Sequence, residues 1–191
     1  MESSPVFRLV AGLGNPGREY EGTRHNVGFL VADELARRSA CRFAFDAKWN
    51  SEIAQCGGRS IMKPQTFMNL SGEAVGGYAR YFKLQREEIL IIIDDASIPL
   101  GTLRLRRSGT AGGHNGLESV LIHLGSESVP RLRVGIGAPE GMALHDHVLG
   151  RFEDAEQPAL AEAVSRAADT FEYSNAHGLE SAMNQFNQKQ P

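Results

Sequence analysis

The most apolar stretch of this 191-residue chain is the five-residue run 89–93, and two aspartates, Asp94 and Asp95, follow it directly. Four of its residues are β-branched isoleucines. An uninterrupted apolar strand is typical of the centre of a sheet whose two faces are both covered by helices. The run is far shorter than the ~20 apolar residues that span a membrane. We therefore expect a central strand in an α/β fold and no membrane-spanning segment.

Further strands and helices are expected on both sides of this run. Apolar or alternating segments predict strands at 6–13, 102–107 and 131–137, and a hairpin at 51–62 that is broken by Gly57 and Gly58. Helical spacing of apolar residues predicts helices at 26–38, 74–82, 115–124, 160–171 and 179–186. Because strands and helices interleave without repeats or a linker, we expect residues 1–191 to form a single α/β domain. Its mixed β-sheet would be flanked by helices on both faces.

The charge of the chain is unevenly distributed. The formal net charge is −3, so bulk attraction to nucleic acid is not indicated. Residues 96–117 nevertheless contain no acidic side chain, whereas Arg104, Arg106 and Arg107 lie within them. Such a local basic patch suits an anionic partner that is held at a few points. Arginines that only solvate the face of a strand remain the alternative.

The two cysteines and the N-terminus bear on the cellular setting. Cys41 and Cys56 lack the spacing of a metal site and are too few for a disulfide framework. The first residues contain neither the basic region nor the apolar stretch of a secretory signal. We therefore expect a reduced, cytoplasmic protein.

A glycine-rich segment follows the first expected strand. Residues 12–17 match the G-x-G-x-x-G pattern of dinucleotide-binding proteins. In that motif a helix opens within the pattern, but here Pro16 disfavours helical angles at Asn15. We therefore favour a loop that presents Asn15 to a ligand. A dinucleotide-dependent oxidoreductase remains an alternative.

Polar side chains recur beside glycines, next to the expected strand ends and helix starts; they are Asn15, His25, Asn26, Asn69, Asp94, His114 and Asn115. Each alone is more typical of a helix cap or a turn. Together they suggest a cleft in which a neutral histidine accepts a proton and a carboxylate stabilises its charged form. Carboxamides can hold a peptide-like group or a developing oxyanion. No serine or cysteine lies in a recognisable nucleophile motif, so this pattern predicts hydrolysis of an acyl group by water.

Five motifs carry a resemblance to a known family: GLGNPG at 12–17, TRHNVGF at 23–29, QTFMNLSG at 65–72, GGHNGL at 112–117 and RLRVGIG at 131–137. In this order they closely resemble bacterial peptidyl-tRNA hydrolases over about residues 8–152, and the C-terminal helices match loosely. The resemblance implies a monomeric α/β enzyme without metal or cofactor. Its partner would be peptidyl-tRNA, whose ester between the peptide and the 3′ end of the tRNA it would hydrolyse.

The resemblance also implies roles for five residues around the reacting ester. His25 is similar to the catalytic base of the family, and Asp94 to the carboxylate that supports it. Asn69 and Asn115 resemble the amides that hold the substrate and the catalytic water. Asn15 resembles the residue that helps to distinguish a blocked peptidyl group from a free aminoacyl group.

Four further residues would contact the tRNA. Tyr20 and Phe67 resemble aromatic contacts near the tRNA 3′ end. Arg106 and Arg133 fall where the family grips the tRNA 5′-phosphate with basic residues. Side chains alternate between the two faces of a strand, so Arg104 and Arg106, two residues apart in the expected strand 102–107, should share a face.

Two positions depart from the family pattern. Ser97 stands where a second aspartate is usual, so the loop after Asp94 departs from the family pattern. His147 replaces a residue that is commonly aromatic, and we expect residues 145–147 to form a surface loop. A metal-dependent hydrolase that uses Asp94, Asp95 and histidines remains an alternative. So does an RNA-binding protein without catalysis, because a fold does not guarantee an activity.

Overall fold

The computed structural model describes residues 7–188, and the run of isoleucines lies at its centre as strand β5, Ile89–Asp95, which is buried along its whole length. Six more strands join it: β1 (Leu9–Gly12), β2 (Ala44–Asp46), β3 (Ser51–Cys56), β4 (Arg59–Pro64), β6 (Leu103–Arg106) and β7 (Arg131–Gly135). The strand order is β2-β3-β4-β1-β5-β7-β6. The four inner strands β4, β1, β5 and β7 are parallel, and β2, β3 and β6 join them by antiparallel pairing.

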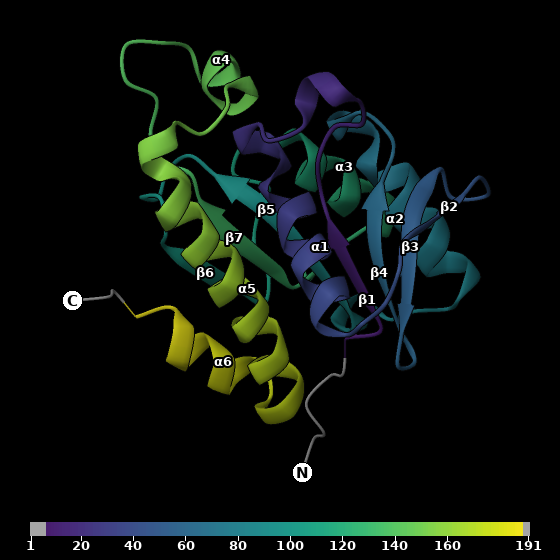
Figure 1. Ribbon diagram of the computed structural model, residues 1–191. Helices are drawn as coiled ribbons and strands as arrows, with labels where there is room; N and C mark the ends of the chain where they lie inside the picture. The colour runs from purple at the N-terminus through teal and green to yellow at the C-terminus, as the bar shows by residue number, and fades with distance from the viewer. Residues whose placement is uncertain (1–6, 189–191) are drawn as a thin grey trace.

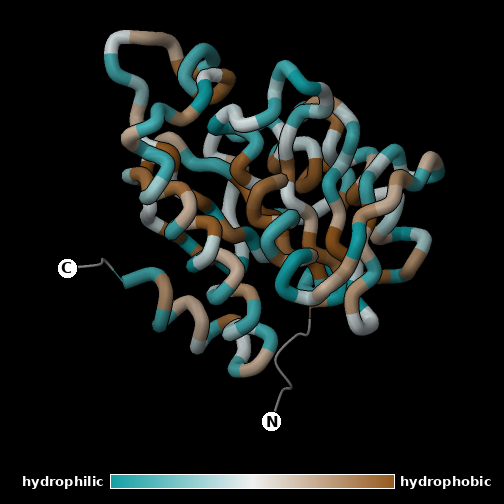
Figure 2. The backbone as a smooth tube through the Cα atoms, viewed as in Figure 1, coloured by the Kyte–Doolittle hydropathy of each residue, from teal (hydrophilic) through white to brown (hydrophobic). Residues whose placement is uncertain are grey.

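Helices cover both faces of this sheet (Figure 1). On one face lie α1 (Val27–Arg38), α5 (Gln157–His177) and α6 (Leu179–Phe186), packed over one hydrophobic core. On the other face α2 (Ser71–Tyr81) and α3 (Asn115–Leu124) pack over a second core. Figure 2 shows the hydrophobic segments gathered in the inner strands. The expected fold class, a mixed sheet flanked by helices on both faces, is confirmed.

The glycines of the N-terminal motif serve packing between a strand and a helix. A Cβ atom on Gly12 would overlap the backbone oxygen of Gly28, so glycine lets α1 lie close against β1. Gly17 adopts a φ of 108° and leads into a short 3₁₀ turn, η1 (Arg18–Tyr20). The first long helix begins only at Val27. This arrangement does not match the dinucleotide motif, in which the helix opens within the glycine pattern.

Several expected elements differ in the structure. The first strand begins at Leu9, and Val6 lies outside the described residues. Helix α2 is continuous through Gly76. Glycine fits at this position because a side chain there would collide with His123 of the adjacent α3. The sequence patterns missed the three-residue edge strand β2 and the six-residue helix α4 (Leu144–Leu149). Both are too short for periodicity to reveal them.

The expected loop at 145–147 is wrong, because these residues lie within α4. His147 is buried, and its Nε2 donates to the carbonyl oxygen of Gly137 at 2.8 Å, which fastens α4 to the chain that precedes it.

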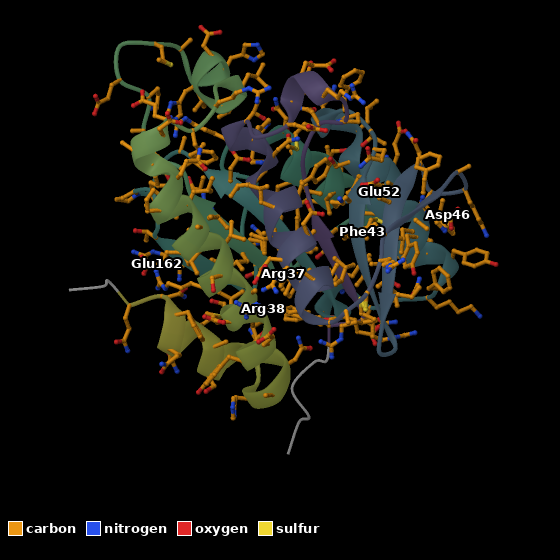
Figure 3. The ribbon with its side chains drawn as sticks, viewed as in Figure 1. Arg37, Arg38, Phe43, Asp46, Glu52 and Glu162 are labelled. Carbon is orange, nitrogen blue, oxygen red and sulfur yellow. A yellow bond between two sulfur atoms is a disulfide. The ribbon has the colours of Figure 1, made fainter. Side chains whose placement is uncertain are left out.

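The expectation that the two cysteines are reduced is also corrected. Cys41 follows α1 and Cys56 ends β3, and the structure joins them in a disulfide with their Cα atoms 5.8 Å apart. Nearby, Arg38 ties α1 to α5 through Asp169 and Ser165; Figure 3 labels Arg37 and Arg38 on this side.

None of the helices in residues 7–188 is long and apolar enough to span a bilayer. The N-terminal residues 1–5, on which the expectation of no secretory signal rests, lie outside the described part of the chain.

Candidate active site

The polar motifs of the sequence meet at the carboxyl edge of the parallel strands. There β1 leads to Asn15, β5 ends in Asp94 and Asp95, and the 3₁₀ turn η2 (Arg24–Asn26) presents His25 just before α1. A second 3₁₀ turn, η3 (Met68–Leu70), carries Asn69 ahead of α2. These segments and α4 surround a cavity of about 580 Å³. Eight of the nine predicted site residues line it: Asn15, Tyr20, His25, Phe67, Asn69, Asp94, Asn115 and Arg133.

The carboxylate of Asp94 joins two histidines. Its Oδ1 lies 2.7 Å from Nδ1 of His25 and 3.0 Å from Nε2 of His114. The three side chains are largely buried; His25 is 12% exposed, His114 9% and Asp94 3%. The structure therefore brings together the predicted pair of His25 and Asp94. It adds His114 as a second partner of Asp94; the sequence placed this residue among the polar side chains of the cleft but gave it no role.

The hydrogen bonds determine which nitrogens carry protons. His114 caps α3, and its Nδ1 accepts from the backbone N–H of Leu117 at 3.1 Å. In neutral His114 the proton must then be on Nε2, which donates to Asp94. Because the ionised carboxylate can only accept, His25 also donates to it, through Nδ1. The Nε2 of His25 is left with a free lone pair, and no hydrogen bond within residues 7–188 occupies it.

Asp94 is held in its charged form. Burial alone would raise its pKa, but His114 and then His25 oppose this by charge and hydrogen bonding and hold the pKa of the carboxyl well below its usual range. A permanent negative charge thus lies beside the ring of His25. Such a charge stabilises the imidazolium that forms when the ring accepts a proton.

Asn26, the neighbour of His25, fixes the loop that carries Asn15. Its side chain accepts from the backbone N–H of Asn15 and donates to the backbone oxygen of the same residue, both at 2.9 Å. The side-chain oxygen of Asn15 accepts from the backbone N–H of Met68 at 2.7 Å. This fixes the orientation of the carboxamide, whose two N–H donors are left for a ligand.

The other predicted substrate contacts are more exposed. The side chains of Asn69 and Asn115 make no hydrogen bond with any residue in 7–188, so both carboxamides are available to a ligand in the cavity. Phe67 is 57% exposed although it is a large apolar residue, and Tyr20 is partly exposed. Exposed aromatic rings at the rim of a polar cavity are suited to stacking against nucleotide bases.

The two predicted phosphate-binding arginines lie on adjacent strands but differ in position. Arg106 pairs with Arg131 in the antiparallel register, and Arg104 pairs with Arg133, so Arg106 and Arg133 are diagonal neighbours on one face. Arg133 lines the cavity, whereas Arg106 is exposed on the edge strand and outside it. Arg131 is buried and donates to the carbonyl oxygens of residues 110, 127 and 129, which makes it a structural residue.

The cluster of His25, Asp94 and His114 could in principle hold a metal ion, because its ligand atoms lie within 4.8 Å of one another. A metal on Nε2 of His114 would require that nitrogen to lose its proton. In neutral His114 the proton would then lie on Nδ1, facing the N–H of Leu117, and two donors would oppose each other. The cap of α3 thus favours a hydrogen-bonded triad over a metal centre.

Sequence reasoning gave His114 no role of its own, although it lies within the GGHNGL motif. Its position at the start of α3 is typical of a helix cap. The structure shows that His114 both caps α3 and forms a hydrogen bond with Asp94. Only the approach of the first turn of α3 to the end of β5 reveals the second contact. The burial of Asp95 and its bonds to Ser97 were missed for a similar reason, since both depend on how the loop folds back.

Fold and site together define an α/β protein in which a histidine and a buried carboxylate are hydrogen-bonded to each other in a cavity at the carboxyl edge of the sheet. The model of the family described as peptidyl-tRNA hydrolase matches residues 9–191. The chain belongs to this family.

Relatives and solved structures agree with this assignment. A peptidyl-tRNA hydrolase of Synechococcus sp. (strain JA-3-3Ab) is 48% identical over 187 residues, which cover 95% of this chain and 83% of the relative. That of Caldanaerobacter subterraneus subsp. tengcongensis is 45% identical over 182 residues, covering 94% and 98%. The crystal structure of the Acinetobacter baumannii peptidyl-tRNA hydrolase superposes with a TM-score of 0.90 at 34% identity, covering 99% of this chain and 100% of that one. The resemblance inferred from the five motifs is thus confirmed.

Proposed function

We propose that this protein hydrolyses the ester bond between the peptide and the tRNA of peptidyl-tRNA, and that His25 acts as the general base. The observation that carries the proposal is that His25 lines the cavity with its Nε2 free of hydrogen bonds to residues 7–188, while its Nδ1 is held by Asp94 at 2.7 Å. A neutral imidazole fixed in this way can accept a proton near neutral pH.

The reaction can be written from these groups. Nε2 of His25 takes a proton from water as its oxygen bonds to the ester carbonyl carbon. The tetrahedral intermediate carries a negative oxygen, which the amide donors of Asn69 and Asn115, both lining the cavity, would stabilise. When the intermediate collapses, the bond to the 3′ oxygen of the tRNA breaks, and the imidazolium returns its proton to that oxygen. Asp94 stabilises the charged ring throughout, and no step needs a metal or cofactor.

The remaining residues have proposed roles in binding. Asn15 would use its free N–H donors to recognise a blocked peptidyl group. Tyr20 and Phe67 would stack near the 3′ end of the tRNA. Arg106 and Arg133 would hold its 5′-phosphate, since guanidinium groups suit phosphate geometrically. We also propose a monomeric, cytoplasmic enzyme formed by a single domain over residues 1–191, and light scattering after size exclusion tests the monomer.

One experiment tests the substrate class. Purified protein is incubated with N-blocked aminoacyl-tRNA and with unblocked aminoacyl-tRNA, both in the presence of a chelator. We expect rapid ester cleavage of the blocked substrate and little of the free one. Binding without cleavage would refute catalysis and leave an RNA-binding protein. Loss of cleavage in chelator would refute the route without metal.

A further inference from the structure

Asp95 is a buried carboxylate that the proposed reaction does not use. It is 7% exposed, although its neighbour Asp94 already brings a negative charge to the same strand end. Its Oδ1 accepts two hydrogen bonds from Ser97, one from the backbone N–H at 2.8 Å and one from the hydroxyl at 2.7 Å. Ser97 therefore fixes one oxygen of Asp95 and directs the other away from the loop.

That second oxygen, Oδ2, faces Arg133. It lies 2.9 Å from Nε of the guanidinium, in an ion pair that is not aligned as a hydrogen bond. The contact uses the Nε side of the arginine and leaves the Nη end free. Nη2 lies beside Gly112, where an added Cβ atom would come within 3.2 Å of it. No hydrogen bond to any residue in 7–188 uses either Nη group, and Arg133 lines the cavity with 31% of its side chain exposed.

We propose that Asp95, itself oriented by Ser97, is a positioning residue that holds Arg133 by Nε so that its two Nη groups face the cavity and bind a phosphate of the tRNA. This inference rests on the proposed phosphate role of Arg133 and deepens it. The Nη edge of a guanidinium can donate two parallel hydrogen bonds to a phosphate, provided that the side chain is held in one orientation. Gly112 keeps space open beside Nη2 for such a ligand.

The same geometry gives a reason for serine at position 97. The aspartate that is usual there in the family would place another carboxylate against Oδ1 of Asp95, where the serine hydroxyl donates instead. With serine, both oxygens of Asp95 face donors or cations. Ser97 thus orients Asp95, which in turn orients Arg133.

The direction in which one substitution changes KM distinguishes this proposal from a purely electrostatic effect. Asp95→Asn removes a negative charge next to an anion-binding cavity, so charge alone predicts tighter binding of tRNA. In the proposed arrangement the asparagine oxygen keeps the two donors of Ser97, and its uncharged Nδ2 then lies against Nε of Arg133. The ion pair is lost, and two N–H groups face each other instead. Arg133 loses its orientation, and we expect KM for full-length peptidyl-tRNA to rise by about tenfold, the factor that corresponds to one such lost interaction.

The experiment measures KM and kcat for the unchanged protein, Asp95→Asn, Arg133→Ala and the double variant. Asp154→Asn, an exposed residue without a bond to any arginine in 7–188, is the control for the same change of charge. We expect Asp95→Asn to raise KM far more than it lowers kcat, and to add nothing in the Arg133→Ala background. If Asp95→Asn lowers KM as the control does, or adds its full effect in that background, the positioning role is wrong. If Arg133→Ala leaves KM unchanged, the phosphate role itself fails.

Three substrates identify the phosphate: full-length peptidyl-tRNA with its 5′-phosphate, the same tRNA without it, and an N-blocked aminoacyl-adenosine that has no phosphate. If the rise in KM caused by Asp95→Asn disappears when the tRNA lacks its 5′-phosphate, Arg133 binds that phosphate. If the rise persists without the 5′-phosphate, Arg133 binds a phosphodiester of the tRNA backbone. An equal effect on the adenosine ester overturns the proposal. If Asp95→Asn does not fold, Ser97→Ala takes its place, with a smaller rise in KM expected because one of two donors to Oδ1 is lost. An unchanged KM for Ser97→Ala would then refute the inference.

Discussion

Replacing Asp94 by asparagine separates two functions of this carboxylate, its charge and its control of the histidine protons. In the structure one oxygen, Oδ1, accepts from both His25 and His114. The proton of His114 is fixed on Nε2 by Leu117, so an asparagine at this position must present its oxygen there. That oxygen has two lone pairs and can accept from Nδ1 of His25 as well. Asp94→Asn thus keeps the productive tautomer and removes only the charge.

The size of the effect follows from the contact. Two unit charges about 4 Å apart in a partly buried site attract by about 4 kcal/mol, which corresponds to about three pH units. His25 borders a cavity and is 12% exposed, so solvent screens part of this attraction. Without the negative charge the imidazolium form is less stable, so neutral His25 persists to lower pH. The acidic limb of the rate profile moves to lower pH.

The assay is kcat/KM for N-blocked aminoacyl-tRNA as a function of pH, with Asp94→Ala as the comparison. Alanine removes the acceptor as well as the charge, so both the orientation and the tautomer of His25 are lost. We expect Asp94→Asn to lower kcat by about 10²-fold, less than the ~10⁴-fold loss seen where such a change reverses a histidine tautomer. Asp94→Ala should lower it further. A limb that moves to higher pH, or an alanine variant as active as the asparagine variant, would refute the shared acceptor.

Two other predictions concern stability. The guanidinium of Arg24 donates two hydrogen bonds to Glu156, at 2.9 and 2.8 Å, and lowers the pKa of that carboxyl. The resulting stabilisation is fully present above the pKa of about 4.3 that glutamate has in the unfolded chain, and it is lost as pH falls through the lower pKa of the folded state. Glu156→Gln should therefore make Tm fall less steeply as the pH is lowered. A decline of Tm as steep as in the unchanged protein would contradict this. The disulfide of Cys41 and Cys56 closes a short loop, so reduction should lower stability by about 3 kcal/mol and Tm by roughly 6–12 °C. A Cys41→Ser variant is the control, and equal Tm values with and without reductant in the unchanged protein would contradict the prediction.

The fold followed from the sequence where the signal was strong and local. The isoleucine run predicted a central strand because only a doubly covered strand buries so many adjacent apolar side chains. The hairpin was marked by Gly57 and Gly58, both of which adopt positive φ. Helix α4 was missed because six residues give little periodicity, and the burial of His147 depends on the distant Gly137.

The candidate site followed from the sequence to the level of residues but not of contacts. Motifs and strand ends placed His25 and Asp94 at one edge, and the structure brings them to 2.7 Å. The second histidine on Asp94 could not be inferred, because a residue that caps a helix gives no sign of a further partner. The ion pair of Arg133 with Asp95 also depends on the register between β5 and β7, which cannot be predicted from the local sequence of either strand.

The central claim is that Nε2 of His25 takes the proton from the attacking water, and one measurement tests it most directly. The single-turnover rate of ester cleavage of N-blocked aminoacyl-tRNA is compared between the unchanged protein and His25→Ala, with chelator present and with Tm measured for both. The account predicts a rate lower by about 10²–10⁴-fold with substrate binding and Tm retained, because general-base catalysis contributes about that factor. A folded His25→Ala variant that cleaves the ester at nearly the unchanged rate would contradict it.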